Sequence, residues 1–159
     1  MKIAIVPGSF DPMTKGHINI IERASILFDK VFVAVMINST KKYMFSCKER
    51  TEIARLSVSH LENVEVIFDD GMLADLASRL DACAIVKGIR DDKDYVYEFE
   101  MAQFNARRNP KAQTVFLPCD EGAREISSTV VRTKLENGGD ISDIVSDKAL
   151  EYIDKCKKI

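Results

Sequence analysis

The chain begins with a short apolar strand that runs into a loop of small, polar and structure-breaking residues. The strand covers Ile3 to Val6, and the segment from Pro7 to His17 reads P-G-S-F-D-P-M-T-K-G-H. Its proline and glycine interrupt regular structure, so we expect the strand to end there and an amphipathic helix to begin no earlier than Thr14 or Gly16. In an α/β sheet such a loop lies at the ligand-binding carboxyl edge. The positive end of the following helix makes phosphate the expected ligand class.

Three further groups of residues follow other predicted strands and carry donors for oxygen anions. Residues 87–90 read K-G-I-R, in which two cations flank a glycine that allows close approach to a ligand. Residues 124–129 place a run of hydroxyls at a helix start after the fifth strand. Lys41 and Lys42 follow the second strand. Because the carboxyl ends of parallel strands meet at one edge, we expect these groups to converge on the first loop.

Taken singly, each of these groups has an interpretation that involves no ligand. The lysine pair is typical of a solvated loop, the hydroxyl run of helix capping, and the two cations after the fourth strand of a surface ion pair. Asp11 and Pro12 are typical of a turn. His60 has no His or Cys at ligand spacing, which indicates a structural or exposed residue. His17 differs, because an imidazole in the first turn of a helix at the ligand edge can donate to a phosphate oxygen.

Short β-branched apolar runs alternate with longer segments of helical period along the chain. The strand candidates are Ile3–Val6, Val31–Ile37, Val64–Phe68, Ala84–Val86 and Val115–Leu117. They are apolar on both faces, which is typical of a parallel sheet covered by helices on each side. We therefore predict an α/β fold, Rossmann-like and doubly wound, with a five-stranded parallel sheet and C-terminal helices in a single domain over residues 1–159.

The segments between the strands carry helix signals. The first helix has an apolar face made of Ile18, Ile21, Ala24 and Phe28. The second helix begins with an S-x-x-E capping box at Ser46 and Glu49. A further helix is predicted over Tyr95 to Arg108, before the fifth strand.

The tail after Ser127 is predicted to form two or three short helices. Gly138 and Gly139 interrupt them, and Leu150 and Ile153 share one face near the end.

Composition limits the classes of function. With 159 residues and 46% apolar content, the chain can bury a substantial core without disulfides or metal. Its 23 basic and 25 acidic residues give a net charge of -2, which provides no overall field for nucleic acid or anionic lipid. The four cysteines form no C-x-x-C pair, which favours reduced thiols over zinc or redox chemistry. The apolar run at residues 2–6 is too short for a secretory signal, and the later apolar runs are too short to span a membrane, so we expect a cytoplasmic protein with no membrane or nucleic-acid partner.

Together the motifs resemble the nucleotidyltransferase superfamily. The run from Gly8 to His17 is similar to its T/H-x-G-H signature, which binds the α and β phosphates of a nucleotide. With K-G-I-R at 87–90 and I-S-S-T at 126–129, the chain resembles the bacterial phosphopantetheine adenylyltransferase family. The resemblance extends to S-T-K-K-Y-M-F and Y-V-Y-E-F-E-M-A, at 39–45 and 95–102. It implies transfer of AMP from ATP to 4′-phosphopantetheine by direct in-line attack, without a covalent enzyme intermediate, giving 3′-dephospho-coenzyme A and pyrophosphate.

The resemblance also implies roles for single residues. The catalytic set is His17, Lys41 and Arg90. The ATP-binding set is Ser9, Phe10, His17, Gly88, Ile89, Arg90, Glu98, Ala123, Arg124, Glu125, Ile126, Ser127, Ser128 and Thr129. The substrate-binding set is Ser9, Lys41, Leu73, Lys87, Met101 and Asn105. Lys87 stands where many members carry Arg, which keeps the charge but loses the two-pronged contact with phosphate. Some members place an aromatic residue against the adenine in the segment that corresponds to residues 121–125, where this chain has none. Stacking of the Arg124 guanidinium on the adenine is one option instead.

The resemblance implies further partners. Magnesium is expected to bridge the triphosphate, with no metal held by protein ligands alone. A homo-oligomer, a hexamer in the family, and feedback inhibition by coenzyme A are expected as well.

Other functions remain open at this stage. Glycerol-phosphate cytidylyltransferases and nicotinamide mononucleotide adenylyltransferases are similar, but their signature usually reads H-x-G-H where this chain has Thr14. Outside enzymes, a nucleotide-binding sensor or an electron-transfer module of related topology is an alternative, because fold alone does not determine function. A sensor has no need of His17.

Overall fold

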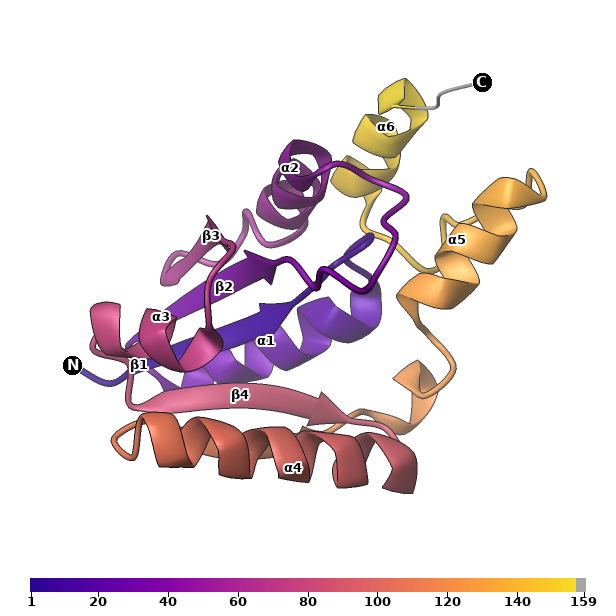
Figure 1. The fold of residues 1–159 in the computed structure, drawn as a ribbon. Helices are drawn as coiled ribbons and strands as arrows, with labels where there is room; N and C mark the ends of the chain where they lie inside the picture. Colours follow the sequence, from indigo (N-terminus) through magenta and orange to yellow (C-terminus); the bar gives the residue numbers. More distant parts are fainter. Residues whose placement is uncertain (157–159) are drawn as a thin grey trace.

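The centre of the molecule is a parallel sheet with the strand order β3-β2-β1-β4-β5 (Figure 1). A computed structural model describes residues 1–156. The strands are β1 (Ile3–Gly8), β2 (Lys30–Met36), β3 (Val64–Asp69), β4 (Ala84–Ile89) and β5 (Gln113–Pro118), so all five predicted strands are confirmed. Because the winding reverses after β3, the carboxyl ends of β1 and β4 form the switch point where doubly wound folds bind ligands.

Helices cover both faces of the sheet (Figure 1). They are α1 (Lys15–Leu27), α2 (Cys47–Ser57), α3 (Leu73–Arg79), α4 (Asp92–Arg108), α5 (Ser128–Glu136) and α6 (Asp147–Cys156), with a short 3-10 helix over Glu121–Ala123. Side chains of α1, α2 and α6 join one core cluster, and those of α3 join a smaller cluster on the opposite face. Within residues 1–156, no helix combines the length and apolarity that crossing a membrane requires.

Strand β1 contributes to both core clusters. Ala4 and Val6 pack in the larger cluster and Ile5 in the smaller one, as the alternation of side chains along a strand requires. All three residues are buried, which explains the continuous apolar run in the sequence.

The start of α1 is determined by Thr14. Its side chain accepts a hydrogen bond from the His17 backbone N–H, and the His17 side chain accepts one from the Thr14 backbone N–H, which completes a capping box. The predicted helix start near Thr14 is therefore confirmed, as is the capping box of Ser46 and Glu49 at the start of α2. Ser127 caps α5 in the same way, by accepting from the backbone N–H of Val130.

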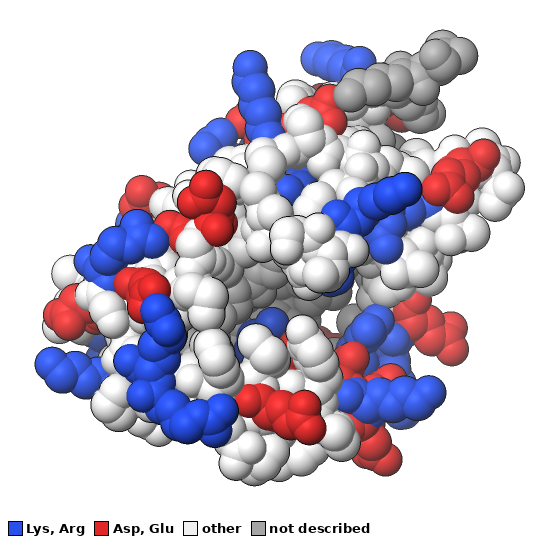
Figure 2. All heavy atoms as spheres, in the orientation of Figure 1, with Lys and Arg blue, Asp and Glu red and all other residues white. Residues whose placement is uncertain are grey.

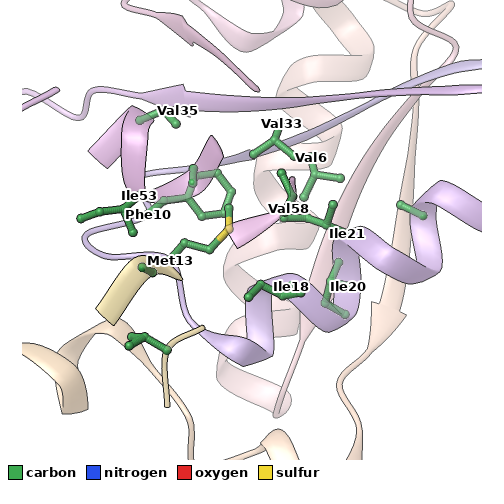
Figure 3. Close-up of a cluster of buried hydrophobic side chains, with 14 of the residues drawn as sticks. Val6, Phe10, Met13, Ile18, Ile20, Ile21, Val33, Val35, Ile53 and Val58 are labelled. Atoms are coloured by element: carbon green, nitrogen blue, oxygen red, sulfur yellow. The ribbon is translucent and has the colours of Figure 1, made fainter. Parts of the chain in front are cut away.

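Phe10 turns the loop after β1 back into the core (Figure 3). Its backbone has a positive φ of 47°, a conformation that few residues other than glycine adopt, and its ring is buried. A Cβ atom on Gly8 would lie 2.9 Å from the ring, so glycine is needed there. Met13, Ile18 and Ile21 complete this part of the larger core cluster.

Several predicted boundaries are wrong. Strand β1 does not end at Val6 but runs on to Gly8, because pairing with β2 continues through Pro7 and Gly8. Pairing with β4 stops at Ile5, so the sheet has already opened on that side, where a proline is tolerated. Strand β4 also runs three residues past Val86, which places Lys87 and Gly88 inside the strand and leaves only Arg90 after it. Helix α4 begins at Asp92, three residues before the predicted start.

We predict that truncating Ile21 destabilises the fold. Ile21 is fully buried on α1, so Ile21→Ala should lower the free energy of unfolding by about 2–5 kcal/mol, because it removes apolar contacts and leaves a cavity. Urea denaturation measures this change. Ile26 lies on the same helix but is 82% exposed, so Ile26→Ala should stay within about 0.5 kcal/mol of wild type. Equal losses in the two variants would contradict the assigned packing of α1.

Candidate functional site

A cleft of about 610 Å³ opens where β1 and β4 separate at their carboxyl ends. Its walls come from the loop between β1 and α1, the loop after β2, the end of β4, the start of α4 and the start of α5. Figure 2 shows this face of the molecule hollowed at its centre, with Lys and Arg side chains on several sides of the hollow. The predicted convergence of the strand ends on one edge is therefore confirmed.

Most of the predicted site residues line this cleft. They are Ser9, Phe10, His17, Lys41, Lys87, Gly88, Arg90, Glu98, Ala123, Ile126, Ser127, Ser128 and Thr129. The cleft does not include Ile89, Arg124, Glu125, Leu73, Met101 or Asn105. Arg124 and Glu125 are exposed beside the 3-10 helix, which leaves the proposed stacking of Arg124 on adenine without a preformed contact.

Leu73, Met101 and Asn105 lie on two helices that contact each other outside the cleft. Leu73 begins α3 and packs against the smaller core cluster, whereas Met101 and Asn105 belong to α4. On α4, Asp94 and Glu98 line the cleft. Met101 and Asn105 follow at helical spacing on the same face, so that face runs from the cleft toward α3.

His17 is held as a neutral imidazole. The Thr14 backbone N–H donates to Nδ1 at 3.0 Å, so Nδ1 carries no proton and Nε2 does. Removal from water, followed by the positive charges of Arg90 and Lys87, lowers the pKa of His17 from 6.5 to about 4. The Phe10 ring packs edge-on against the imidazole, with 5.1 Å between ring centroids. The cleft therefore contains an N–H donor that stays uncharged at neutral pH.

The two cations of the K-G-I-R motif are each paired with a carboxylate of α4. Lys87 Nζ lies 3.2 Å from Glu98 Oε1, and Arg90 Nε donates to Asp94 Oδ2 at 3.0 Å. The alternative interpretation as an ion pair thus describes real contacts, but both pairs line the cleft. A phosphate that enters would compete with the carboxylates for these cations.

The cleft is locally positive although the whole chain is slightly negative. Its lining includes the cations of Lys41, Lys42, Lys87, Arg90 and Arg132 and the carboxylates of Asp11, Asp94 and Glu98, which leaves an excess of two positive charges. Lys41 and Lys42 are exposed, and within residues 1–156 neither takes part in an ion pair. This local field favours a polyanionic ligand such as a nucleotide triphosphate.

Asp11 is a structural centre of the site that the sequence interpretation missed. Its carboxylate is buried and accepts hydrogen bonds from the backbone N–H groups of Met44 and Phe45, both at 2.9 Å. Its carbonyl oxygen accepts from Arg132 Nη1 at 2.8 Å. Asp11 does more than form a turn, because it joins three segments of the cleft wall. A carboxylate between the apolar residues Phe10 and Met13 was the available signal.

The hydroxyls at the start of α5 have separate tasks. Ser127 caps the helix, Ser128 Oγ donates to the Pro12 carbonyl at 2.7 Å, and Thr129 Oγ1 accepts from Arg132 Nη2 at 3.2 Å. The capping interpretation is therefore correct for Ser127. All three residues also line the cleft, so the amino end of α5, the positive end of the helix dipole, lies at the same space.

The remaining histidine and the cysteines form no metal-ligand cluster within residues 1–156, although Cys119 lines the cleft. The His60 imidazole is exposed and contacts Glu22 at 2.9 Å, which agrees with its predicted structural or exposed role. All four cysteines are free thiols. Across residues 1–156, no three His, Cys, Asp or Glu side chains gather as metal ligands.

Comparison with known proteins gives a consistent result. A family model described as cytidylyltransferase-like matches residues 5–134. A phosphopantetheine adenylyltransferase of Caldanaerobacter subterraneus subsp. tengcongensis is 43% identical over 159 residues, covering 99% of each chain. One from Clostridium botulinum is 39% identical, covering 100% of each chain.

A solved structure supports the fold. A putative nicotinate-nucleotide adenylyltransferase from Vibrio parahaemolyticus superposes with a TM-score of 0.74, covering 98% of this chain and 93% of its own. The two sequences are 22% identical, so this likeness concerns the architecture alone.

We predict that the His17 imidazole titrates near pH 4. NMR titration of a His60→Gln variant, which leaves His17 as the chain's one imidazole, measures this directly. Because the unfolded chain takes up the proton at about 6.5, lowering the pH from 6.5 toward 4 should also reduce the free energy of unfolding.

The control variant for this titration is Arg90→Gln. It removes one of the positive charges that lower the pKa, so the His17 pKa should rise but stay below 6.5, since burial remains the larger cause. A midpoint near 6.5 in the protein with Arg90 intact would show that the assigned environment of His17 is wrong.

Proposed function

This chain belongs to the phosphopantetheine adenylyltransferases, within the cytidylyltransferase-like family, and we propose that it transfers the adenylyl group of ATP to 4′-phosphopantetheine. The products are 3′-dephospho-coenzyme A and pyrophosphate. The observation that supports this reaction best is the cleft itself, in which a neutral imidazole lies among cations from several strand ends.

The reaction joins two phosphates and requires alignment and charge neutralisation rather than a protein nucleophile. The attacking group is already an anion, so no residue needs to remove a proton from it. In our proposal, Lys41 and Ser9 hold the acceptor phosphate in line with the α-phosphorus of ATP. The Nε2–H of His17 donates to the α-phosphate oxygens, where negative charge grows in the transition state.

The leaving pyrophosphate has its own set of donors in this proposal. Arg90 would bind the β and γ phosphates, together with the hydroxyls and backbone N–H groups at residues 127–129. Gly88 lines the cleft as well, and a Cβ atom there would lie 2.9 Å from the Ile20 side chain. Glu98, Ala123 and Ile126 line the cleft beside Gly88 and would contact the nucleotide with it. Contacts from Arg124 and Glu125 would require segment 121–125 to move toward bound ATP. A contact from Ile89 would come from the carboxyl end of β4, between Gly88 and Arg90.

The pantetheine arm would extend along α4. Lys87 and Glu98 lie at the cleft, and Met101 and Asn105 continue on the same helical face toward Leu73 on α3. Apolar walls with one buried amide suit a chain that contains amide bonds. In this proposal the ion pair of Lys87 and Glu98 separates the phosphate end of the acceptor from its apolar arm.

Magnesium belongs to the proposal as part of the ATP substrate. The three carboxylates of the cleft are all engaged, Asp11 by backbone N–H groups and Asp94 and Glu98 by cations. Their engagement suits an ion held mainly by triphosphate oxygens and water, as Mg²⁺ prefers. Bound there, it would neutralise and bridge the phosphates.

We also propose a cytoplasmic homo-oligomer, with the hexamer of the family resemblance as its form and coenzyme A as a feedback inhibitor. Exposed apolar side chains on α4 support the oligomer, because a monomer rarely leaves so many on one helix. They are Tyr95, Val96, Tyr97, Phe99, Met101 and Phe104. Coenzyme A contains the same pantetheine group as the acceptor, so we expect it to compete with the acceptor for the same part of the site.

The proposed function is tested by measuring pyrophosphate release with ATP, Mg²⁺ and one acceptor at a time. We expect kcat/KM for 4′-phosphopantetheine to exceed that for glycerol phosphate and nicotinamide mononucleotide by about 100-fold or more, because only the first supplies the arm that α3 and α4 would bind. Tight ATP binding without turnover on any acceptor would instead identify a nucleotide sensor.

We predict that His17→Ala lowers kcat by about 100-fold or more with little change in ATP affinity. The reason is that the variant loses one preorganised donor that acts mainly in the transition state. Steady-state kinetics and calorimetric titration with ATP separate the two effects. His60→Ala is the matched control, since that imidazole is exposed and lies outside the cleft. Normal turnover by His17→Ala would remove His17 from the mechanism.

A further inference from the structure

Arg50 on α2 is a buried cation that the proposed reaction does not use. It is 1% exposed, and no carboxylate of the described residues lies within ion-pair distance of its guanidinium. Its Nε atom is buried and has no hydrogen-bond partner there. A buried guanidinium without a counter-ion is costly, and an apolar side chain would fill the same space without that cost. Its presence therefore points to a task beyond filling the core.

The contacts of Arg50 reach the segments that form one wall of the cleft. Its Nη1 donates to the carbonyl oxygen of Ser9 at 2.6 Å and to that of Met36 at 3.1 Å. Ser9 belongs to the loop after β1, and Met36 ends β2, just before the segment that carries Lys41. A single planar group thus ties the ends of two neighbouring strands together at the ligand edge.

The same guanidinium supports Tyr43, which lines the cleft. The carbon centre of the Arg50 guanidinium lies 4.0 Å from the centroid of the Tyr43 ring, a cation–π contact. The Tyr43 hydroxyl accepts from the Asn38 backbone N–H at 2.6 Å and lies 3.4 Å from the Ser9 hydroxyl. The Tyr43 side chain therefore connects the segment that carries Lys41 to the loop that carries Ser9.

We propose that Arg50 is a positioning residue for the acceptor phosphate, acting through the Ser9 carbonyl and the Tyr43 ring. The inference rests on the proposed function, in which Ser9 and Lys41 hold that phosphate. Within the part of the chain that the structure describes, the Arg50 guanidinium contacts Ser9, Met36, Cys47 and Tyr43, and it contacts neither Arg90 nor residues 127–129, which would hold the pyrophosphate of ATP. Loss of Arg50 should therefore impair the acceptor side of the cleft and spare the nucleotide side.

The experiment compares Michaelis constants for the two substrates in matched variants of the full chain. Arg50→Lys keeps the charge but loses the planar fork, and Tyr43→Leu removes the ring. Both should raise KM for 4′-phosphopantetheine by about tenfold, the scale of one lost hydrogen bond, and leave KM for ATP within about twofold of wild type. Tyr43→Phe keeps the ring over the guanidinium and should recover most of the loss.

Arg55→Lys is the control, because Arg55 lies on the same helix, is exposed, and pairs with Glu52 away from the cleft. It should change neither constant. A thermal melt of each variant records whether it folds. If Arg50→Lys does not fold, the Michaelis constants of Tyr43→Leu for the two substrates test the positioning role instead.

Parallel changes in both Michaelis constants, or none, in an active enzyme would overturn the positioning role and leave the proposed function intact. Absence of pyrophosphate release by wild type would overturn the proposed function, and the positioning role with it.

Discussion

The buried carboxylate of Asp11 is the contact on which the cleft depends. A carboxylate removed from water must be fully hydrogen-bonded, and Asp11 meets this need with two backbone N–H groups before α2 and the nearby guanidinium of Arg132 on α5. The three segments it joins carry Ser9, Lys41 and the hydroxyls of α5. Because the partners lie far apart in the chain, the ligand site forms only when the whole fold does.

The electrostatics of the cleft follow from the same geometry. A chain of net charge -2 presents an excess of two positive charges where β1 and β4 separate. Burial, followed by the positive charges of Arg90 and Lys87, lowers the pKa of His17 to about 4, so the imidazole does not add a further charge. A neutral donor among cations suits the stabilisation of a transition state in which charge moves between phosphates, since its N–H is oriented in advance by Thr14.

Local patterns predicted the elements well because local physics decides them. The β-branched runs became the five strands, Thr14 lies at the start of α1, and Ser46 caps α2 as its motif predicted. Boundaries failed where a neighbouring strand outweighed local preference. Pro7 and Gly8 remain in β1 because β2 pairs with them, and Lys87 belongs to β4 because β5 pairs with it.

The sequence alone therefore determined the sheet, the placement of phosphate-binding groups at its carboxyl edge, and the resemblance that names their reaction. The tertiary structure decided which partner each charged group takes. Lys87 pairs with Glu98 across the β4–α4 contact, Asp11 is buried within its turn, and the Arg50 guanidinium packs against the Tyr43 ring. Spacing along the chain cannot show this, because burial and the pairing of charges depend on contacts between segments that only folding brings together.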